Sequence, residues 1–87
     1  MWYVYVLESQ KNGNLYKGFC KDLKKRVLQH NAGETYSTKS GVPWNLIYYE
    51  AFIDKDDAIV REKYLKTGWG RRSLQKMLHN YFKNTKE

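Results

Sequence analysis

Two strand-like segments joined by Asn12-Gly13 place the tightest limit on how this chain can fold. Residues 2–8 and 14–20 are both rich in aromatic and β-branched side chains, which favour strands. Asn and Gly both accept positive φ, so this dipeptide is typical of the centre of a two-residue β-hairpin turn. The chain is therefore predicted to begin with an antiparallel hairpin.

The register of this hairpin decides which side chains share a face. A turn centred on the dipeptide pairs Leu7 with Gly18 and Tyr5 with Cys20. Side chains alternate between the two faces of a strand, so an even slip in register keeps the same set together and an odd slip separates it. One face is then expected to carry Tyr3, Tyr5, Leu7, Tyr16 and Gly18.

The rest of the chain predicts helices and one more strand. A helix is expected at 22–31, capped by Asp22 and closed by Gly33, and is followed by an irregular segment at 32–43. A strand is expected at 44–53. Two more helices are expected at 54–67 and 70–83, separated by Gly68-Trp69-Gly70. The strand is apolar or aromatic on both faces, so we expect it to be the central one. The expected fold class is α+β, a three-stranded, mainly antiparallel sheet flanked by about three helices, in one domain over residues 1–87.

The amino-acid composition favours some classes of binding partner over others. The net charge is +7, from 16 Lys and Arg against 9 Asp and Glu, which favours a polyanion, nucleic acid before membrane, although a merely soluble basic domain has the same balance. The single cysteine, Cys20, excludes a disulfide framework and is interpreted as a core residue, and no Cys/His cluster has zinc spacing. The apolar opening at residues 2–7 is too short for a signal peptide or a membrane span, so a cytoplasmic location is expected.

One carboxylate lies on an unexpected side of its helix. In the second predicted helix Ala58 and Leu65 define the buried stripe, and Glu62 lies about 40° from Ala58 by the helical repeat. A carboxylate on an inward face is costly unless it is paired or coordinates a cation. Two interpretations follow: an ion pair with Arg26 or Arg61, or a metal ligand that faces a cleft.

These residues together resemble the GIY-YIG nuclease superfamily. The resemblance covers about residues 2–82 and is carried by Tyr3-Val4-Tyr5, Tyr16-Lys17-Gly18, Asp22-Leu23 followed by Arg26 and His30-Asn31, and Arg61-Glu62. Tyr3 stands where the family's first motif has glycine, and Lys17 where its second has isoleucine. The chain is most similar to the small stand-alone bacterial members, and also to the N-terminal nuclease domain found in the bacterial ABC excinuclease.

The resemblance implies metal-dependent hydrolysis of phosphodiesters. It implies catalytic roles for Tyr5, Tyr16, Arg26, His30 and Glu62. Glu62 would hold one Mg²⁺ or Mn²⁺, Arg26 would donate to a phosphate oxygen, and a tyrosine would orient the attacking water. Gly18 would leave a hollow on the sheet face between the tyrosines.

Two assignments keep alternatives. His30 either positions a tyrosine or receives a proton, or it is a helix C-terminal residue favoured by the helix dipole. The family also carries a late asparagine near its active site, for which Asn80 is the candidate and Asn31 and Asn84 are alternatives.

The nucleic-acid surface is predicted from exposed cations and rings. The candidate phosphate contacts are Lys17, Lys24, Lys25, Lys39, Arg71 and Arg72. Tyr36 and Trp69 could stack on a base, although Trp69 would also serve to cover the junction of the last two helices. DNA is expected ahead of RNA as the substrate of a structure-selective endonuclease of repair or recombination. A nucleic-acid-binding domain with weak or no catalysis, and a nuclease that depends on a protein partner, are the alternatives; the oligomeric state stays open.

Overall fold

The sheet is antiparallel and has three strands. The computed structural model describes residues 1–85, with strands β1 (Trp2–Ser9), β2 (Leu15–Cys20) and β3 (Trp44–Phe52) in the order β2-β1-β3. The α+β prediction is confirmed, but the prediction that the third strand is central is wrong. The central strand is β1, which pairs with β2 on one side and with β3 on the other. Its four consecutive residues from Val4 to Leu7 are buried, so neither face of β1 is open to solvent.

The hairpin register differs from the prediction by two residues. Tyr5 pairs with Gly18 and Leu7 with Tyr16, in place of the expected Leu7–Gly18 and Tyr5–Cys20 pairs. The turn is longer than two residues, since the Ser9 amide donates to the Asn14 carbonyl at 2.8 Å and leaves residues 10–13 in the loop. The slip is even, so the predicted set of residues still shares one face.

The helices begin at short polar caps. They are α1 (Leu23–Asn31), the 3₁₀ turn η1 (Lys39–Gly41), α2 (Lys55–Leu65), α3 (Gly68–Met77) and α4 (His79–Thr85), and Asp22, Asp54 and Thr67 cap α1, α2 and α3. The last predicted helix is thus two helices, because Leu78 leaves helical geometry with φ −106° and ψ 28°. Within the described chain, no helix has the length and apolarity needed to cross a membrane.

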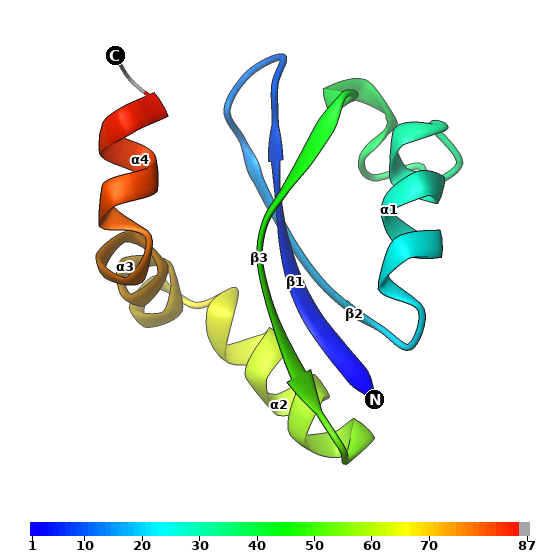
Figure 1. Cartoon of the computed structure of the whole chain (residues 1–87), viewed down its shortest axis with the longest axis vertical. Helices are drawn as coiled ribbons and strands as arrows, with labels where there is room; N and C mark the ends of the chain where they lie inside the picture. The colour runs from blue at the N-terminus through cyan, green and yellow to red at the C-terminus, as the bar shows by residue number, and fades with distance from the viewer. Residues whose placement is uncertain (86–87) are drawn as a thin grey trace.

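The two faces of the sheet carry different layers (Figure 1). One face packs Val4 and Val6 of β1 against α2 and α3, in a core completed by Ala58, Leu65 and Leu74. The other face packs Tyr5 and Leu7 with Cys20 and Trp44, against the α1 side chains Leu23 and Val27. Because β2 lies at the edge of the sheet, its residues are reachable from both layers.

Candidate active site

A chain of hydrogen bonds joins β1 to α1 and to the loop that follows α1. The Tyr5 hydroxyl lies 2.9 Å from His30 Nε2, and His30 Nδ1 lies 2.8 Å from Thr38 Oγ1. Thr38 Oγ1 donates to the Thr35 carbonyl, so it accepts from Nδ1–H, and Nε2 is left to accept from Tyr5. The three side chains are only 1%, 0% and 1% exposed, so the order of these bonds is fixed inside the protein.

Two further predicted residues meet this chain. Arg26 precedes His30 by one helical turn of α1, and its positive charge is near enough to act on the pKa values of both Tyr5 and His30. The Tyr16 ring lies 5.1 Å from the His30 ring and 6.4 Å from the Tyr5 ring, centroid to centroid. The structure therefore brings together Tyr5, Tyr16, Arg26 and His30, from two strands and one helix.

Burial sets the protonation of this cluster. It raises the pKa of Tyr5 well above the ordinary value of a phenol, with a further contribution from Tyr16, although Arg26 acts in the opposite direction. Burial, and then the Arg26 charge, lower the pKa of His30. Neutral His30 as acceptor and protonated Tyr5 as donor agree with the bond order above. A histidine held as a cation by the helix dipole would have a raised pKa, so that alternative does not fit.

Gly18 provides the space for the Tyr5 ring. A Cβ on Gly18 would lie 2.5 Å from the Tyr5 hydroxyl oxygen and 2.7 Å from Cζ. Gly18 thus has the steric role expected of it, and the space beside it is occupied by the Tyr5 phenol. Because Gly18 has no side chain, the Tyr5 phenol can pass close over β2 and reach His30.

Glu62 has a different partner from those expected. Its carboxylate pairs with Lys66 at 3.3 Å, one turn later on α2, and its side chain is 13% exposed. Arg61 instead makes a bidentate pair with Glu50 of β3, with Nη2 at 2.8 Å from Oε2, and Arg26 lies near Tyr5. The predicted ion pair of Glu62 with either arginine is wrong, since both guanidinium groups are oriented elsewhere.

Glu62 approaches the cluster from the other layer. It lies four residues after Ala58 and three before Leu65, both fully buried against the sheet, so it points inward. Its partner Lys66 is near enough to Lys17 of β2 to contribute to a lowered pKa there. Glu62 is thus near the β2 edge, and its convergence with Tyr16 across that edge stays a prediction.

The donor set suits an ion that is only partly held by protein. Among residues 1–85 no group of three or more His, Cys, Asp and Glu could enclose a metal. Mg²⁺ keeps several waters and commonly binds through one or two carboxylates plus substrate phosphates. A single, largely buried carboxylate such as Glu62 fits that mode once Lys66 has moved away from it.

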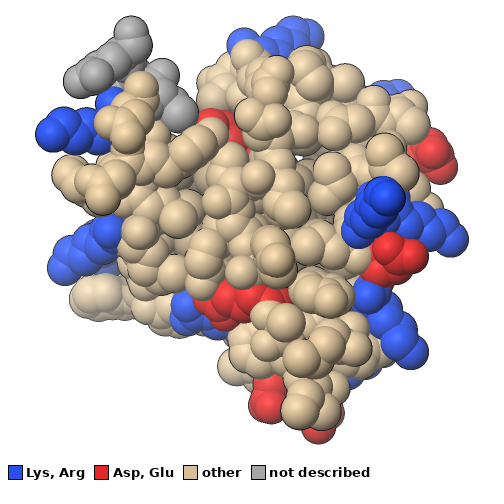
Figure 2. All heavy atoms as spheres, viewed as in Figure 1, with Lys and Arg blue, Asp and Glu red and all other residues tan. Residues whose placement is uncertain are grey.

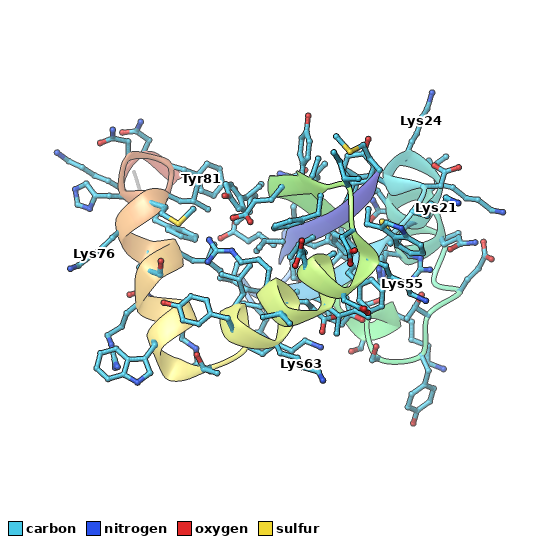
Figure 3. The ribbon with its side chains drawn as sticks, turned by 90° about the horizontal axis from the view of Figure 1, so that it is seen from below. Lys21, Lys24, Lys55, Lys63, Lys76 and Tyr81 are labelled. Carbon is cyan, nitrogen blue, oxygen red and sulfur yellow. The ribbon has the colours of Figure 1, made fainter. Side chains whose placement is uncertain are left out.

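The predicted nucleic-acid contacts lie on both layers. Lys24 and Lys25 project from α1, whereas Arg71 and Arg72 belong to α3. Lys and Arg lie mainly along the rim of the face seen in Figure 2, whose centre is mostly uncharged, and Figure 3 shows Lys24 and Lys76 at opposite ends of the molecule. The predicted cations of α1 and α3 therefore lie on helices of different layers.

Two predicted cations stack on exposed rings. Lys39 Nζ lies 4.9 Å from the Tyr36 ring centroid, and Arg72 lies 4.5 Å from that of Trp69. Trp69 is 72% exposed, so it does not cover the helix junction. Both rings remain available as stacking surfaces.

Thr38 and Trp44, which hold the cluster together with Asn31, were not singled out in the sequence. The Asn31 side chain donates to the Trp44 carbonyl at 3.0 Å and accepts from its amide at 2.6 Å, and Trp44 Nε1 donates to the Thr38 carbonyl. These bonds give Asn31 a structural role, and Asn80 and Asn84 are both exposed on α4. Thr38 has no local signal in an irregular segment, whereas Trp44, the aromatic residue that begins β3 directly after Pro43, could have been noticed.

Comparison with known proteins adds a family and a related structure. Residues 1–76 match the family described as the GIY-YIG catalytic domain. A UPF0213 protein of Staphylococcus saprophyticus is 41% identical over 66 residues, which cover 75% of this chain and 79% of that protein. Another, of Lacticaseibacillus paracasei, is 42% identical over 66 residues, 75% of this chain and 73% of the relative. The solution NMR structure of a UPF0213 protein of Bacillus halodurans has a TM-score of 0.58 and 28% identity, covering 98% of this chain and 94% of that one.

Proposed function

The chain belongs to the GIY-YIG catalytic domain family, and we propose that it is a metal-dependent endonuclease that hydrolyses phosphodiester bonds in nucleic acid. The observation that carries the proposal is the cluster in which Arg26 and His30 both engage Tyr5 while Tyr16 packs beside them. The net charge of +7 favours a polyanionic substrate. We further propose structure-selective cleavage of DNA, in cytoplasmic repair or recombination, as the setting.

The two tyrosines have separate roles in this proposal. Tyr5 is buried and its hydroxyl already donates to His30, so it is a poor base and serves to position Arg26. Tyr16 is only partly buried and lies on the edge strand, where solvent and substrate can reach it. Tyr16 is therefore the residue that orients the attacking water.

Arg26 is the residue that contacts the reacting phosphate. A guanidinium has five N–H donors in a planar fork, so Arg26 can stay near Tyr5 and still donate to a non-bridging oxygen. These bonds strengthen as negative charge develops on the phosphoryl oxygens. His30 and Thr38 act through Tyr5 and are positioning residues.

Glu62 is the ligand proposed for the divalent ion, Mg²⁺ or Mn²⁺. When bound, the ion neutralises charge on the scissile phosphate and its leaving oxygen. Glu62 must then exchange the Lys66 ammonium for the ion, and Lys66 becomes free to pair with a substrate phosphate.

A cleavage assay tests the proposal. The purified chain is incubated with branched, nicked and single-stranded DNA and with RNA, in Mg²⁺, Mn²⁺ or EDTA, beside Glu62→Gln and Arg26→Ala. Lys63→Ala is a matched control, since Lys63 is exposed on the same helix as Glu62. We expect cutting that requires the ion, survives in Lys63→Ala and falls at least about 100-fold in the other two variants.

The pairing of Glu62 with Lys66 favours one competing function, a nucleic-acid-binding domain without catalysis. In that case the protein binds but does not cut, and Glu62→Gln binds as wild type does. Cutting that appears only after addition of cell extract would instead indicate a nuclease that depends on a protein partner.

A further inference from the structure

A second cleft opens beside the proposed active site, between the tip of the hairpin and the last two helices. Its volume is about 1190 Å³, and its lining includes Lys17, Arg71, His79, Tyr81, Phe82 and Lys83. The lining comes from β1, β2, α3 and α4, which the fold brings together from both ends of the described chain. None of the residues of the Tyr5 cluster lines it.

Two cations, Lys17 and Arg71, line this cleft. Burial first, then Arg71 and Lys66, lower the pKa of Lys17. In the described part of the chain the ion pairs join Arg61 to Glu50 and Lys66 to Glu62, so Lys17 and Arg71 form no ion pair there. Neighbouring unpaired cations on packed elements are costly alone and favourable beside a phosphate.

Glu8, the acidic residue in the lining of the cleft, already has a hydrogen-bond partner. Glu8 accepts a hydrogen bond from the Tyr81 hydroxyl at 2.5 Å, and Figure 3 shows Tyr81 on the side of α4 toward the sheet. Burial, with this bond, raises the pKa of Tyr81 to about 12, so the phenol stays a donor to Glu8. This bond joins α4 to β1 at the cleft.

Aromatic rings complete the lining. The Tyr81 and Phe82 rings lie 5.4 Å apart in an edge-on arrangement, and both are partly exposed. Cations that follow a backbone and rings that stack on bases are the two elements of single-strand binding sites.

The cleft adjoins the proposed site of cutting at the β2 edge of the sheet. Lys17 lies between Tyr16 and Gly18 in β2, and its pairing with Val6 directs its side chain to the opposite face from theirs. Lys66, whose charge acts on Lys17, pairs with Glu62. A strand bound at Lys17 thus lies on the same side of the sheet as α2 and Glu62, and reaches Tyr16 by crossing the β2 edge.

We propose that this cleft binds a single-stranded stretch of the substrate next to the cleavage point, with phosphates at Lys17 and Arg71 and a base against the rings of Tyr81 and Phe82. The inference rests on the proposed function and adds the substrate class to it, a duplex with a single-stranded tail or branch.

Binding in EDTA tests the cleft separately from cutting. Fluorescence anisotropy compares a labelled single strand, a blunt duplex and a duplex with a single-stranded tail, for wild type, Arg71→Ala and Lys17→Ala with Arg71→Ala. The matched control is Lys63→Ala with Lys76→Ala, which removes the same charge at exposed positions outside the lining.

We expect wild type to prefer the tailed duplex over the blunt one and the cleft double variant to lose that preference. In the cleft double variant the slope of log K against log salt concentration should decrease in magnitude by about 1 to 2. In Arg71→Ala alone this decrease should be about half as large. An equal loss in the control, or no preference for the tail in wild type, overturns the inference. If wild type cuts DNA in Mg²⁺ while the cleft double variant still prefers the tailed duplex, the cleft assignment fails and the proposed function stands. If wild type cuts nothing but the cleft double variant loses the preference for the tail, the proposed function fails and the cleft assignment stands.

Discussion

At the scale of single residues, Tyr5 and Tyr16 share a face of the sheet but not an environment. Tyr5→Phe removes the donor to His30 Nε2 and leaves a buried nitrogen unsatisfied, which should cost about 1–3 kcal/mol of unfolding free energy. Tyr16→Phe should change stability by only about 0.5 kcal/mol yet reduce cleavage at least about 100-fold. Urea denaturation and single-turnover cleavage measure the two effects.

The matched control for both tyrosine variants is Tyr36→Phe, because the Tyr36 side chain is 85% exposed. It should leave stability and cleavage unchanged. Equal losses of stability in Tyr5→Phe and Tyr16→Phe, or full activity in Tyr16→Phe, would contradict the division of roles.

His30 makes the stability of the fold depend on pH with a definite sign. Its pKa is lowered in the folded state, so the unfolded chain binds the proton more readily. The stabilisation is complete above the unfolded pKa of about 6.5 and is lost as pH falls below it. The urea midpoint should therefore decrease from about pH 7.5 to about pH 5.5.

In His30→Gln this part of the pH dependence should disappear, even if the variant is less stable throughout. A midpoint of the wild type that rises on acidification would contradict the assignment of His30 as a buried neutral residue.

At the scale of elements, Gly70 sets how closely α3 can approach α2. A Cβ there would overlap the Tyr64 carbonyl oxygen and lie 2.5 Å from Leu65 Cα, both backbone atoms that cannot move alone. Gly70→Ala should cost about 3 kcal/mol, measured by thermal or urea denaturation. Gly68→Ala, two residues earlier and with open space around its Cβ, should be neutral or gain about 0.5 kcal/mol. Similar stabilities of the two variants would show that this contact does not limit the packing.

The element types could be predicted from local patterns, but their pairing could not. Period-2 and helical patterns placed the strands and α1, and Asp22 marked its cap. The Asn12-Gly13 signal gave a turn of the wrong length, because a bond from the Ser9 amide to the Asn14 carbonyl closes a longer loop. The central strand was misassigned because β3 is aromatic on both faces, whereas burial depends on having two neighbours, as β1 has. The apolar face of the last helices continued past Leu78, so periodicity gave no sign of the break.

At the scale of the whole molecule, the site is assembled from segments far apart in the sequence. Parity along the hairpin placed Tyr5 and Tyr16 on one face, and the four-residue spacing placed Arg26 and His30 on one side of their helix. That the two pairs meet was implied by the family resemblance. The Thr38 partner of His30 depends on the path of an irregular loop, and the layer from which Glu62 approaches depends on the order of packing. Neither is encoded in a local pattern.

The basic surface should extend to α1. Lys24→Ala with Lys25→Ala should weaken binding of DNA at low salt and flatten the slope of log K against log salt by about 2, as expected for two lost phosphate contacts. Isothermal titration at a series of salt concentrations measures this. An unchanged slope would exclude α1 from the binding surface.

The convergence of Glu62 with the tyrosine cluster across the β2 edge can be measured directly by NMR with Mn²⁺ as a paramagnetic probe. If the ion binds at Glu62 beside this cluster, the amide signals of Glu62, Tyr16 and Gly18 broaden together at low Mn²⁺, and Glu62→Gln abolishes the effect. Broadening confined to the acidic start of α2 at Asp54, Asp56 and Asp57, unchanged in Glu62→Gln, would show that no such common site exists.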